Sequence, residues 1–132
     1  MKKSTLLAAL LLTITFSYSQ SAKKLVKTGI TKFQKEDYKG AIAEYTKAIE
    51  IDSNYADAYF YRGYTKFTLK DYQGAIIDYT KNVELDPKSY DGFIDRGDVK
   101  YILKDYKGAI DDFSSSLELY STDYETYFKR GR

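Results

Sequence analysis

The chain has 132 residues, which allows one small domain or one short repeat array. Its 21 lysine and arginine residues against 19 aspartate and glutamate residues give a formal net charge of +2, so charge gives no reason to expect nucleic-acid binding. Cysteine and histidine are both absent, which excludes disulfides and removes most nucleophilic, proton-transfer and transition-metal chemistry. Aromatic residues are abundant, with 15 tyrosines and 7 phenylalanines.

The first 19 residues have the order of a secretory signal peptide. Two lysines open the segment, and residues 6–16 form an apolar run that we expect to be too short to span a bilayer. Small residues follow, so we expect cleavage after Ser19, or alternatively after Ala22. The lysine-rich start favours a bacterial protein exported to the periplasm or beyond the cell, with no membrane span after cleavage. An ordinary N-terminal hydrophobic helix is the alternative.

A hexapeptide recurs along the rest of the chain, each copy beginning 34 residues after the last: DYKGAI at 37–42, DYQGAI at 71–76 and DYKGAI at 105–110. Further columns are identical in all three copies: Gly29/Gly63/Gly97, Lys32/Lys66/Lys100 and Glu50/Glu84/Glu118. A fixed period of this length indicates a repeat array. The array is expected over 20–132, with repeats at about 22–55, 56–89 and 90–123 and a partial fourth at 124–132.

Each repeat has the pattern of two helices. In the second repeat, apolar residues at helical spacing predict one helix over about 55–69 and another over about 72–84. Asp71 stands before the second helix as an N-cap, and Pro87 follows that helix and cannot extend it. No stretch alternates apolar and polar residues for long enough to predict a strand. The sequence therefore predicts an all-α protein.

The repeat resembles the tetratricopeptide repeat (TPR), whose period is about 34 residues. The resemblance covers about 23–132 and rests, in the second copy, on Tyr59, Arg62-Gly63, Ala75, Tyr79 and Pro87. It implies an α-solenoid of stacked antiparallel helix hairpins, with three repeats plus a partial fourth. The chain departs from the family in its lysine column, where an aromatic residue is usual; there the lysine stem can pack while the ammonium stays in water.

The recurring small and aromatic residues have expected structural roles. Gly63 and Ala75 would let the two helices of one hairpin approach closely, and Tyr72 and Tyr79 would fill the space between neighbouring hairpins. Ile42 and its counterparts are expected in the core. A glycine within a first helical turn costs up to about 1 kcal/mol relative to alanine, and the sequence offers no contact that offsets this cost. The glycines concerned are Gly40, Gly74 and Gly108.

The family resemblance implies a function. In TPR proteins the first helices of the hairpins line a concave groove that binds segments of other proteins, so we expect a non-catalytic protein-interaction module. On this register the groove carries Val26, Ile30, Phe33, Asp57, Phe60, Tyr64, Phe67, Asp91, Ile94, Asp98 and Tyr101. An aromatic floor with acidic residues along one side predicts a partner segment with basic and apolar side chains.

The aromatic residues of this groove have two interpretations. Phe33, Phe67 and Tyr101 lie at a spacing that core packing explains equally well. Phe60 and Tyr64 favour the exposed groove, because the column of Tyr64 varies in size and polarity between copies.

TPR members that grip the acidic C-terminal tails of chaperones use lysine, asparagine and arginine side chains. The corresponding positions here are Val26, Ile30, Tyr61, Asp91 and Asp95. None of them matches, and two have the reversed charge. We therefore expect no binding of an acidic C-terminal tail through that clamp.

Two other classes of function stay open. A structural or self-associating array, or a fragment of a larger scaffold, is favoured by Tyr124, Tyr127 and Phe128, which are apolar where an end repeat normally has a polar face. An enzyme would have to rely on carboxylates, lysines and tyrosines alone. No motif predicts a metal or cofactor: Asp111-Asp112 lacks the spacing of a calcium loop and predicts a solvated helix face.

Overall fold

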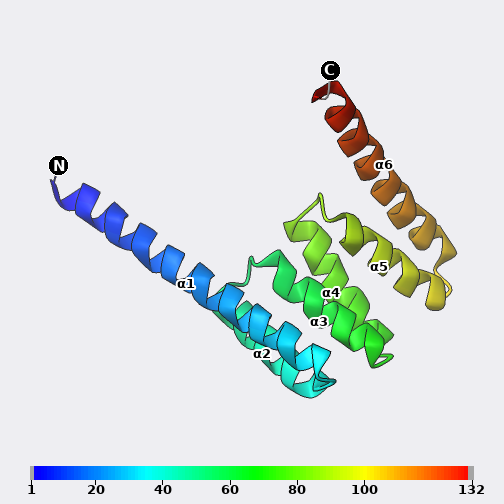
Figure 1. The fold of residues 1–132 in the computed structure, drawn as a ribbon, viewed down its shortest axis with the longest axis horizontal. Helices are drawn as coiled ribbons and strands as arrows, with labels where there is room; N and C mark the ends of the chain where they lie inside the picture. Colours follow the sequence, from blue (N-terminus) through cyan, green and yellow to red (C-terminus); the bar gives the residue numbers. More distant parts are fainter. Residues whose placement is uncertain (1, 131–132) are drawn as a thin grey trace.

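The computed structural model describes the backbone of residues 2–130 and the side chains of residues 2–122. That part of the chain forms six helices and no strand: α1 (Lys2–Gln34), α2 (Tyr38–Ile51), α3 (Ala56–Thr68), α4 (Tyr72–Leu85), α5 (Tyr90–Ile102) and α6 (Tyr106–Arg130). The helices pair into three antiparallel hairpins that follow one another along a stack (Figure 1). The expected all-α solenoid is confirmed.

The first helix of each hairpin lies on the inner side of the stack. α1 contacts α3, and α3 contacts α5, whereas α2, α4 and α6 make no contact with one another over their described residues. α2 and α4 instead contact the first helix of the next hairpin. Because the first helices lie closer together, α1, α3 and α5 form the concave face, and α2, α4 and α6 form the convex face.

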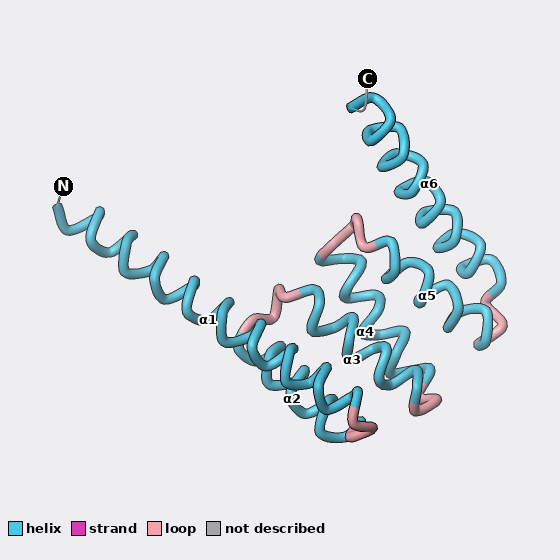
Figure 2. Tube along the Cα trace, viewed as in Figure 1, coloured by secondary structure: helices cyan, strands magenta, loops and turns pink. Residues whose placement is uncertain are grey.

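Each hairpin turns through the same short loop (Figure 2). In the first turn, the Asp37 N–H donates to the Lys32 carbonyl and the Glu36 N–H donates to the Phe33 carbonyl, and the other two turns repeat both bonds. Glu36 has a φ of 61°, and its counterparts Lys70 and Lys104 have φ values of 62° and 66°. This is the Schellman arrangement, in which a left-handed residue satisfies the last carbonyls of a helix.

Aspartate begins each second helix, as expected for an N-cap. The carboxylates of Asp37, Asp71 and Asp105 accept from the backbone N–H of the glycine three residues later, at 2.9, 2.9 and 3.0 Å. The same carboxylate lies against the glycine Cα, so a Cβ on Gly40, Gly74 or Gly108 would collide with it. These glycines, which the sequence left unexplained, provide the space that the capping carboxylate needs.

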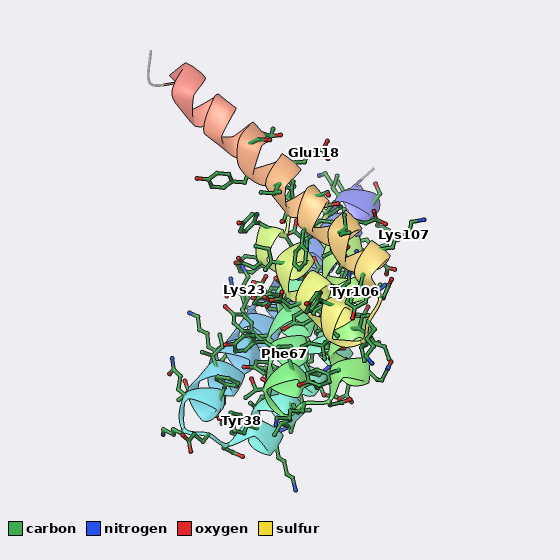
Figure 3. The ribbon with its side chains drawn as sticks, turned by 90° about the vertical axis from the view of Figure 1, so that its right-hand side faces the viewer. Lys23, Tyr38, Phe67, Tyr106, Lys107 and Glu118 are labelled. Atoms are coloured by element: carbon green, nitrogen blue, oxygen red, sulfur yellow. The ribbon has the colours of Figure 1, made fainter. Side chains whose placement is uncertain are left out.

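The tyrosine of the hexapeptide packs inside its own hairpin. Tyr38, Tyr72 and Tyr106 each make an edge contact with the aromatic ring that ends the preceding helix, at centroid distances of 5.2, 5.7 and 5.4 Å. Figure 3 shows Tyr38, Phe67 and Tyr106, one from each hairpin, following one another along the stack. Tyr72 also packs against the cluster of Ala75, Tyr79 and Val99, which includes a residue of the next hairpin, as predicted.

The core consists mainly of small residues and tyrosines. Ala75 and Tyr79 are buried against Val99 of the next hairpin, which confirms the predicted role of Tyr79 between hairpins. A Cβ on Gly63 would lie 3.1 Å from the Tyr79 ring, so the close helix approach expected there is also confirmed. The isoleucine that follows each core alanine lies about 100° further around the helix. Ile76 is nevertheless half-buried and packs against this cluster, as predicted, whereas Ile110 is 64% exposed, which corrects its predicted place in the core.

The recurring lysines form ion pairs with buried carboxylates. The ammonium groups of Lys32, Lys66 and Lys100 lie 2.8 Å from carboxylate oxygens of Glu44, Asp78 and Asp112, respectively. The hydrogen bond from Lys32 holds the pKa of Glu44 below its ordinary value, against the opposing effect of burial. Lysine at this column therefore pairs with a carboxylate of the second helix in its own hairpin, instead of only extending into water.

In the second and third hairpins an arginine joins the same carboxylate. Arg62 donates to both carboxylate oxygens of Asp78 at 2.9 and 2.7 Å. Arg96 donates to both oxygens of Asp112 at 2.9 and 2.6 Å. Asp112 is 3% exposed, so its predicted place on a solvated helix face is wrong, while its neighbour Asp111 is exposed as expected.

The arginines also connect successive hairpins. Arg62 of α3 donates to the Thr46 hydroxyl of α2 at 3.1 Å, and Arg96 of α5 donates to the Thr80 hydroxyl of α4 at 3.5 Å. One guanidinium group thus contacts the second helix of its own hairpin and the second helix of the hairpin before it. Such a planar group with five donors can satisfy both at once.

The N-terminal part of α1 extends beyond the first hairpin and is exposed, with Leu6, Leu7 and Leu12 among its uncovered side chains (Figure 1). We expected the apolar run to be too short to span a bilayer. Within the continuous helix Lys2–Gln34, however, the apolar part is long enough to cross a membrane by length and composition. A signal sequence near the N-terminus has the same two properties.

The last helix, α6, runs without a break to Arg130, so the separate helix expected from about 124 does not form. Asp52 and Asp86 end the second helices of the first two hairpins and accept from backbone N–H groups two residues later, at 3.0 and 3.1 Å. Tyr120 occupies this column in the third repeat and has no carboxylate to make that turn. The predicted apolar end lies outside the described side chains: Tyr124, Tyr127 and Phe128.

Candidate functional site

All the predicted groove residues lie on α1, α3 and α5, the helices of the concave face. The exposed ones are Asp57, Tyr64, Asp91, Asp98 and Tyr101. The half-buried ones are Ile30, Phe33, Phe60, Phe67 and Ile94. Val26 is only 3% exposed and packs in the core of the first hairpin. The accessible part of the predicted groove is therefore its acidic residues and two of its tyrosines.

Aromatic side chains form a row along this face. Phe33 of α1 contacts Tyr64 of α3 at a centroid distance of 5.5 Å, which joins the first two hairpins. Phe60 packs against Tyr61 at 5.4 Å and against the buried Tyr79 at 5.9 Å. Tyr64 is 43% exposed, whereas Phe60 is half-buried in this packing. Of the two residues predicted to face the partner, Tyr64 is thus the accessible one.

The other three aromatic residues of the groove also take part in core packing. Phe33, Phe67 and Tyr101 each contact the tyrosine across their own hairpin turn. Tyr101 nevertheless stays 62% exposed. The two interpretations that the sequence left open therefore both hold, with packing dominant for Phe33 and Phe67.

Charge changes sign along the groove. At the first hairpin, a hollow of about 370 Å³ is lined by Lys23, Lys24 and Lys27 together with Asp57 and aromatic residues. At the third hairpin, α5 instead presents three carboxylates to the same face: Asp91, Asp95 and Asp98. None of these three takes part in the ion pairs found within residues 2–122. Over the described side chains, the carboxylates at the acidic end of the groove are thus not paired with a cation.

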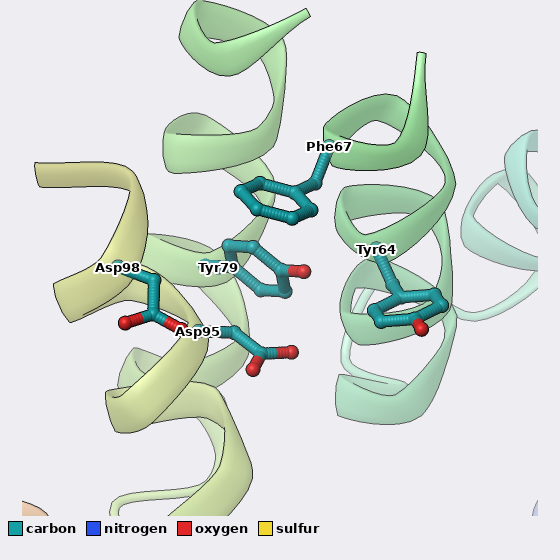
Figure 4. A pocket seen from close by; sticks show the side chains of 5 residues that line it. All are labelled: Tyr64, Phe67, Tyr79, Asp95 and Asp98. Atoms are coloured by element: carbon teal, nitrogen blue, oxygen red, sulfur yellow. The ribbon is translucent and has the colours of Figure 1, made fainter. Parts of the chain in front are cut away.

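A small pocket lies at this acidic end. It has a volume of about 30 Å³ and is lined by Tyr64, Phe67, Tyr79, Asp95 and Asp98, which come from three different helices (Figure 4). Tyr79 is fully buried, and its hydroxyl has no hydrogen-bond partner among the described residues. The pocket therefore combines aromatic walls, two carboxylates and one unpaired hydroxyl.

Electrostatics distinguish Asp95 from the other carboxylates. Burial is the main cause that raises the pKa of Asp95 to about 6, and the negative charges of Asp98 and Asp91 add to it. The Tyr79 hydroxyl interacts with the Asp95 carboxylate and so opposes this rise in pKa, although the two groups lie outside ordinary hydrogen-bond geometry. Burial also raises the pKa of Tyr79. From the sequence, Asp95 was predicted only to be a mismatched clamp residue, although its spacing from Asp91 and Asp98 places all three on one helix face.

No group of three or more acidic side chains in the described part of the chain is arranged to hold a metal ion. The carboxylates of α5 instead face the groove next to aromatic rings. Such a surface suits a cationic or amphipathic ligand.

Comparison with protein families gives two matches. A family described as TPR repeat matches residues 29–70, and one described as tetratricopeptide repeat matches residues 56–89. Residues 29–89 therefore contain tetratricopeptide repeats. A comparison with curated proteins finds no match.

Solved structures with the same arrangement of helices include several TPR domains. The first TPR of Spaghetti (RPAP3), bound to the HSP90 peptide SRMEEVD, has a TM-score of 0.74 and 29% identity, over 76% of this chain and 80% of that one. The Arabidopsis OM64 TPR domain has a TM-score of 0.73 and 26% identity, over 77% and 84%. MamA has a TM-score of 0.77 at 22% identity, over 81% and 63%, which shows a likeness in fold alone.

Proposed function

We propose that this chain is a non-catalytic module that binds a segment of another protein in the groove formed by α1, α3 and α5. The row of partly exposed aromatic side chains that ends in unpaired carboxylates carries the proposal. Aromatic anchors beside a polar rim are typical of surfaces that bind proteins. The peptide held by the similar Spaghetti domain supports this role.

The partner segment carries basic and apolar side chains. Asp57, Asp91 and Asp98 are exposed along the groove and take part in none of the ion pairs within residues 2–122, so they attract a cationic segment. The HSP90 peptide of the Spaghetti domain ends in acidic residues. This chain has Asp91 and Asp95 at two positions where a clamp for such a tail needs cations. An acidic tail is therefore repelled here.

A charge reversal of the groove tests this function. The variant Asp57→Lys/Asp91→Lys/Asp98→Lys changes only exposed residues, so the fold is expected to persist. The matched control, Glu50→Lys/Asp111→Lys/Glu118→Lys, makes the same change in net charge on the convex face. Peptides selected from a random library on the unaltered chain should lose binding to the first variant and keep it for the second. Equal binding to both variants would place the ligand outside the groove.

We further propose that the protein is exported by a bacterium and acts in the periplasm or outside the cell, after removal of residues 1–19. The leucines of α1 between residues 6 and 12, which are all more than half exposed, support this proposal. A membrane-anchoring helix is the other role that fits the length and composition of α1. Intact-mass measurement of the protein from its own cells separates the two: a chain that starts at Gln20 or Lys23 supports export, and a chain that keeps Leu6 supports an anchor.

Self-association is a second candidate function. Ile110, Leu117 and Tyr120 are all more than half exposed on α6 and lie near one another around the helix. An apolar stripe of this kind is a suitable surface for a second copy of the chain. Sedimentation at several protein concentrations tests it, since a molecular mass that stays that of a monomer would remove this function.

A further inference from the structure

The first junction between hairpins shows how a buried tyrosine is normally covered in this array. Tyr45 of α2 is 1% exposed, and the ring of Tyr61 stacks on it at a centroid distance of 6.1 Å. Its hydroxyl interacts with the Thr65 side chain of α3, and the Thr65 hydroxyl itself donates to the Tyr61 carbonyl. Tyr64 lies in the same layer, against Phe33. Within residues 2–122 this junction leaves no buried hydroxyl unpaired.

The second junction uses the same columns with different residues. Tyr79 of α4 corresponds to Tyr45, whereas Asp95, Asp98 and Val99 of α5 replace two tyrosines and the threonine. Val99 has no hydroxyl to interact with Tyr79, which instead interacts with the Asp95 carboxylate from outside ordinary hydrogen-bond geometry. The aspartates are also smaller than the rings that they replace. The result is the pocket of about 30 Å³ with an unpaired tyrosine hydroxyl at its wall.

One kind of ligand would pair with all the unpaired groups of this pocket. Buried hydroxyl groups in proteins are rarely without a hydrogen-bond partner, so the state of Tyr79 indicates a missing donor or acceptor. The two aspartates also take part in no ion pair within residues 2–122, whereas Asp78 and Asp112, two buried carboxylates of the convex helices, each have an arginine and a lysine. A single cationic donor would satisfy both aspartates and the hydroxyl oxygen together.

We propose that the pocket between α3, α4 and α5 binds the ammonium group of one lysine side chain of the partner segment. The proposal rests on the proposed function, because the pocket lies within the groove. An ammonium group has three donors, which suit the Asp95 and Asp98 carboxylates and the Tyr79 oxygen. Tyr64 and Phe67 supply aromatic rings that a cation can approach.

The size of the pocket selects lysine over arginine. A volume of about 30 Å³ has room for a group of the size of a water molecule, and an ammonium group is of similar size. A guanidinium group is planar and larger, and its five donors in a fixed fork need more room. Arginine would therefore contact the mouth of the pocket without filling it.

Titration with small amines tests the pocket without knowledge of the partner. n-Butylammonium is added to the full chain and followed through the NMR signals of the pocket residues, with n-butylguanidinium and n-butanol as matched probes. We expect n-butylammonium to bind about tenfold more tightly than either of the other two. Equal binding of all three probes would mean that the pocket does not recognise the ammonium group. Shifts from none of them would mean that the pocket holds a water molecule only. Either result would overturn the proposal.

Two variants separate the pocket from the general charge of α5. Asp95→Asn/Asp98→Asn removes both pocket carboxylates and is expected to weaken n-butylammonium binding about tenfold or more. Asp91→Asn removes a charge from the same helix outside the pocket and should leave the affinity within about twofold. Circular dichroism checks that each variant is folded. A loss of binding that is as large in Asp91→Asn would contradict a specific pocket.

Peptide selection distinguishes failure of this inference from failure of the proposed function. On the unaltered chain we expect selected peptides to share a lysine at one fixed position, and on Asp95→Asn/Asp98→Asn we expect this preference to disappear. Groove-binding peptides without a shared lysine would overturn the inference and leave the proposed function intact. Failure to select any peptide, with n-butylammonium still bound, would overturn the proposed function and keep the pocket as a cation site.

Discussion

Removal of the Asp95 charge should stabilise this protein at neutral pH, although it should also impair ligand binding. The Asp95 carboxyl is half-buried, and the Asp98 and Asp91 carboxylates lie on the same helix face. Burial without a cation disfavours its charged form. Asparagine has nearly the same shape and no charge, so Asp95→Asn removes this unfavourable interaction while it keeps the packing against Tyr79.

The size and the sign of the effect follow from the pKa. The pKa of Asp95 rises from its ordinary value of 3.8 to about 6 in the folded protein. Each pH unit between the two values corresponds to ~1.4 kcal/mol, which sets a ceiling of about 3 kcal/mol, and partial exposure reduces this to about 1–2 kcal/mol. Because the folded state holds the proton more tightly, the destabilisation is fully present above pH 6 and disappears as the pH falls to 3.8.

Urea unfolding of the two proteins measures this difference. We expect Asp95→Asn to raise the free energy of unfolding by about 1–2 kcal/mol at about pH 7.5 and by almost nothing below about pH 4. Asp111→Asn makes the same chemical change at an exposed site of the convex face, and should alter the free energy by less than about 0.5 kcal/mol at either pH. The reasoning fails if Asp95→Asn destabilises the protein at neutral pH, or stabilises it equally at both.

Three further predictions concern the packing of the hairpins. Asp112→Asn leaves two half-buried cations without their carboxylate and should lower the free energy of urea unfolding by about 3–5 kcal/mol; a loss below about 1 kcal/mol would contradict a structural role for this ion network. Gly74→Ala should stabilise the protein by about 0.8–1 kcal/mol only in an Asp71→Ala background, because there no capping carboxylate meets the new Cβ. A double-mutant cycle that shows no coupling between the two positions would refute this prediction. Tyr79→Phe should be neutral or stabilising in thermal unfolding, because the hydroxyl that it removes has no partner in hydrogen-bond geometry. Tyr45→Phe should instead cost about 0.5–1.5 kcal/mol, because its hydroxyl interacts with the Thr65 side chain. The reverse order of stability would refute this prediction.

The fold could be predicted from the sequence because its signals are local and repeated. The period places the hairpins, and Asp71 and Pro87 mark helix ends by chemistry that depends on neighbouring residues alone. The continuity of α6 was visible in the same columns, since Tyr120 stands where Asp52 and Asp86 end the earlier helices. The proline column does not predict it, because the first repeat has Ser53 in place of Pro87 and its second helix still ends at Ile51.

The site was less predictable, because it depends on which columns of different hairpins meet. Asp111 and Asp112 are neighbours in sequence, yet only Asp112 faces the arginine and lysine of α5. To predict that Asp112 and not Asp111 pairs with these cations, one must know the register of α6 against α5. The lysine pocket depends on the register of three helices at once, so Asp95 could be recognised as a groove residue only after Tyr79 and Val99 had been placed beside it.

The arginines that connect successive hairpins also make the array extendable. The second repeat carries both halves of this connection, since Arg62 reaches back to Thr46 while Thr80 accepts from Arg96 of the next hairpin. A tandem copy of residues 56–89 would therefore meet a compatible surface on either side. Its own Tyr61 and Tyr64 would cover the Tyr79 before it, as they cover Tyr45 in the natural chain. Such an insertion would lengthen the groove by one repeat and change the spacing of its charged ends, while the lysine pocket stays single.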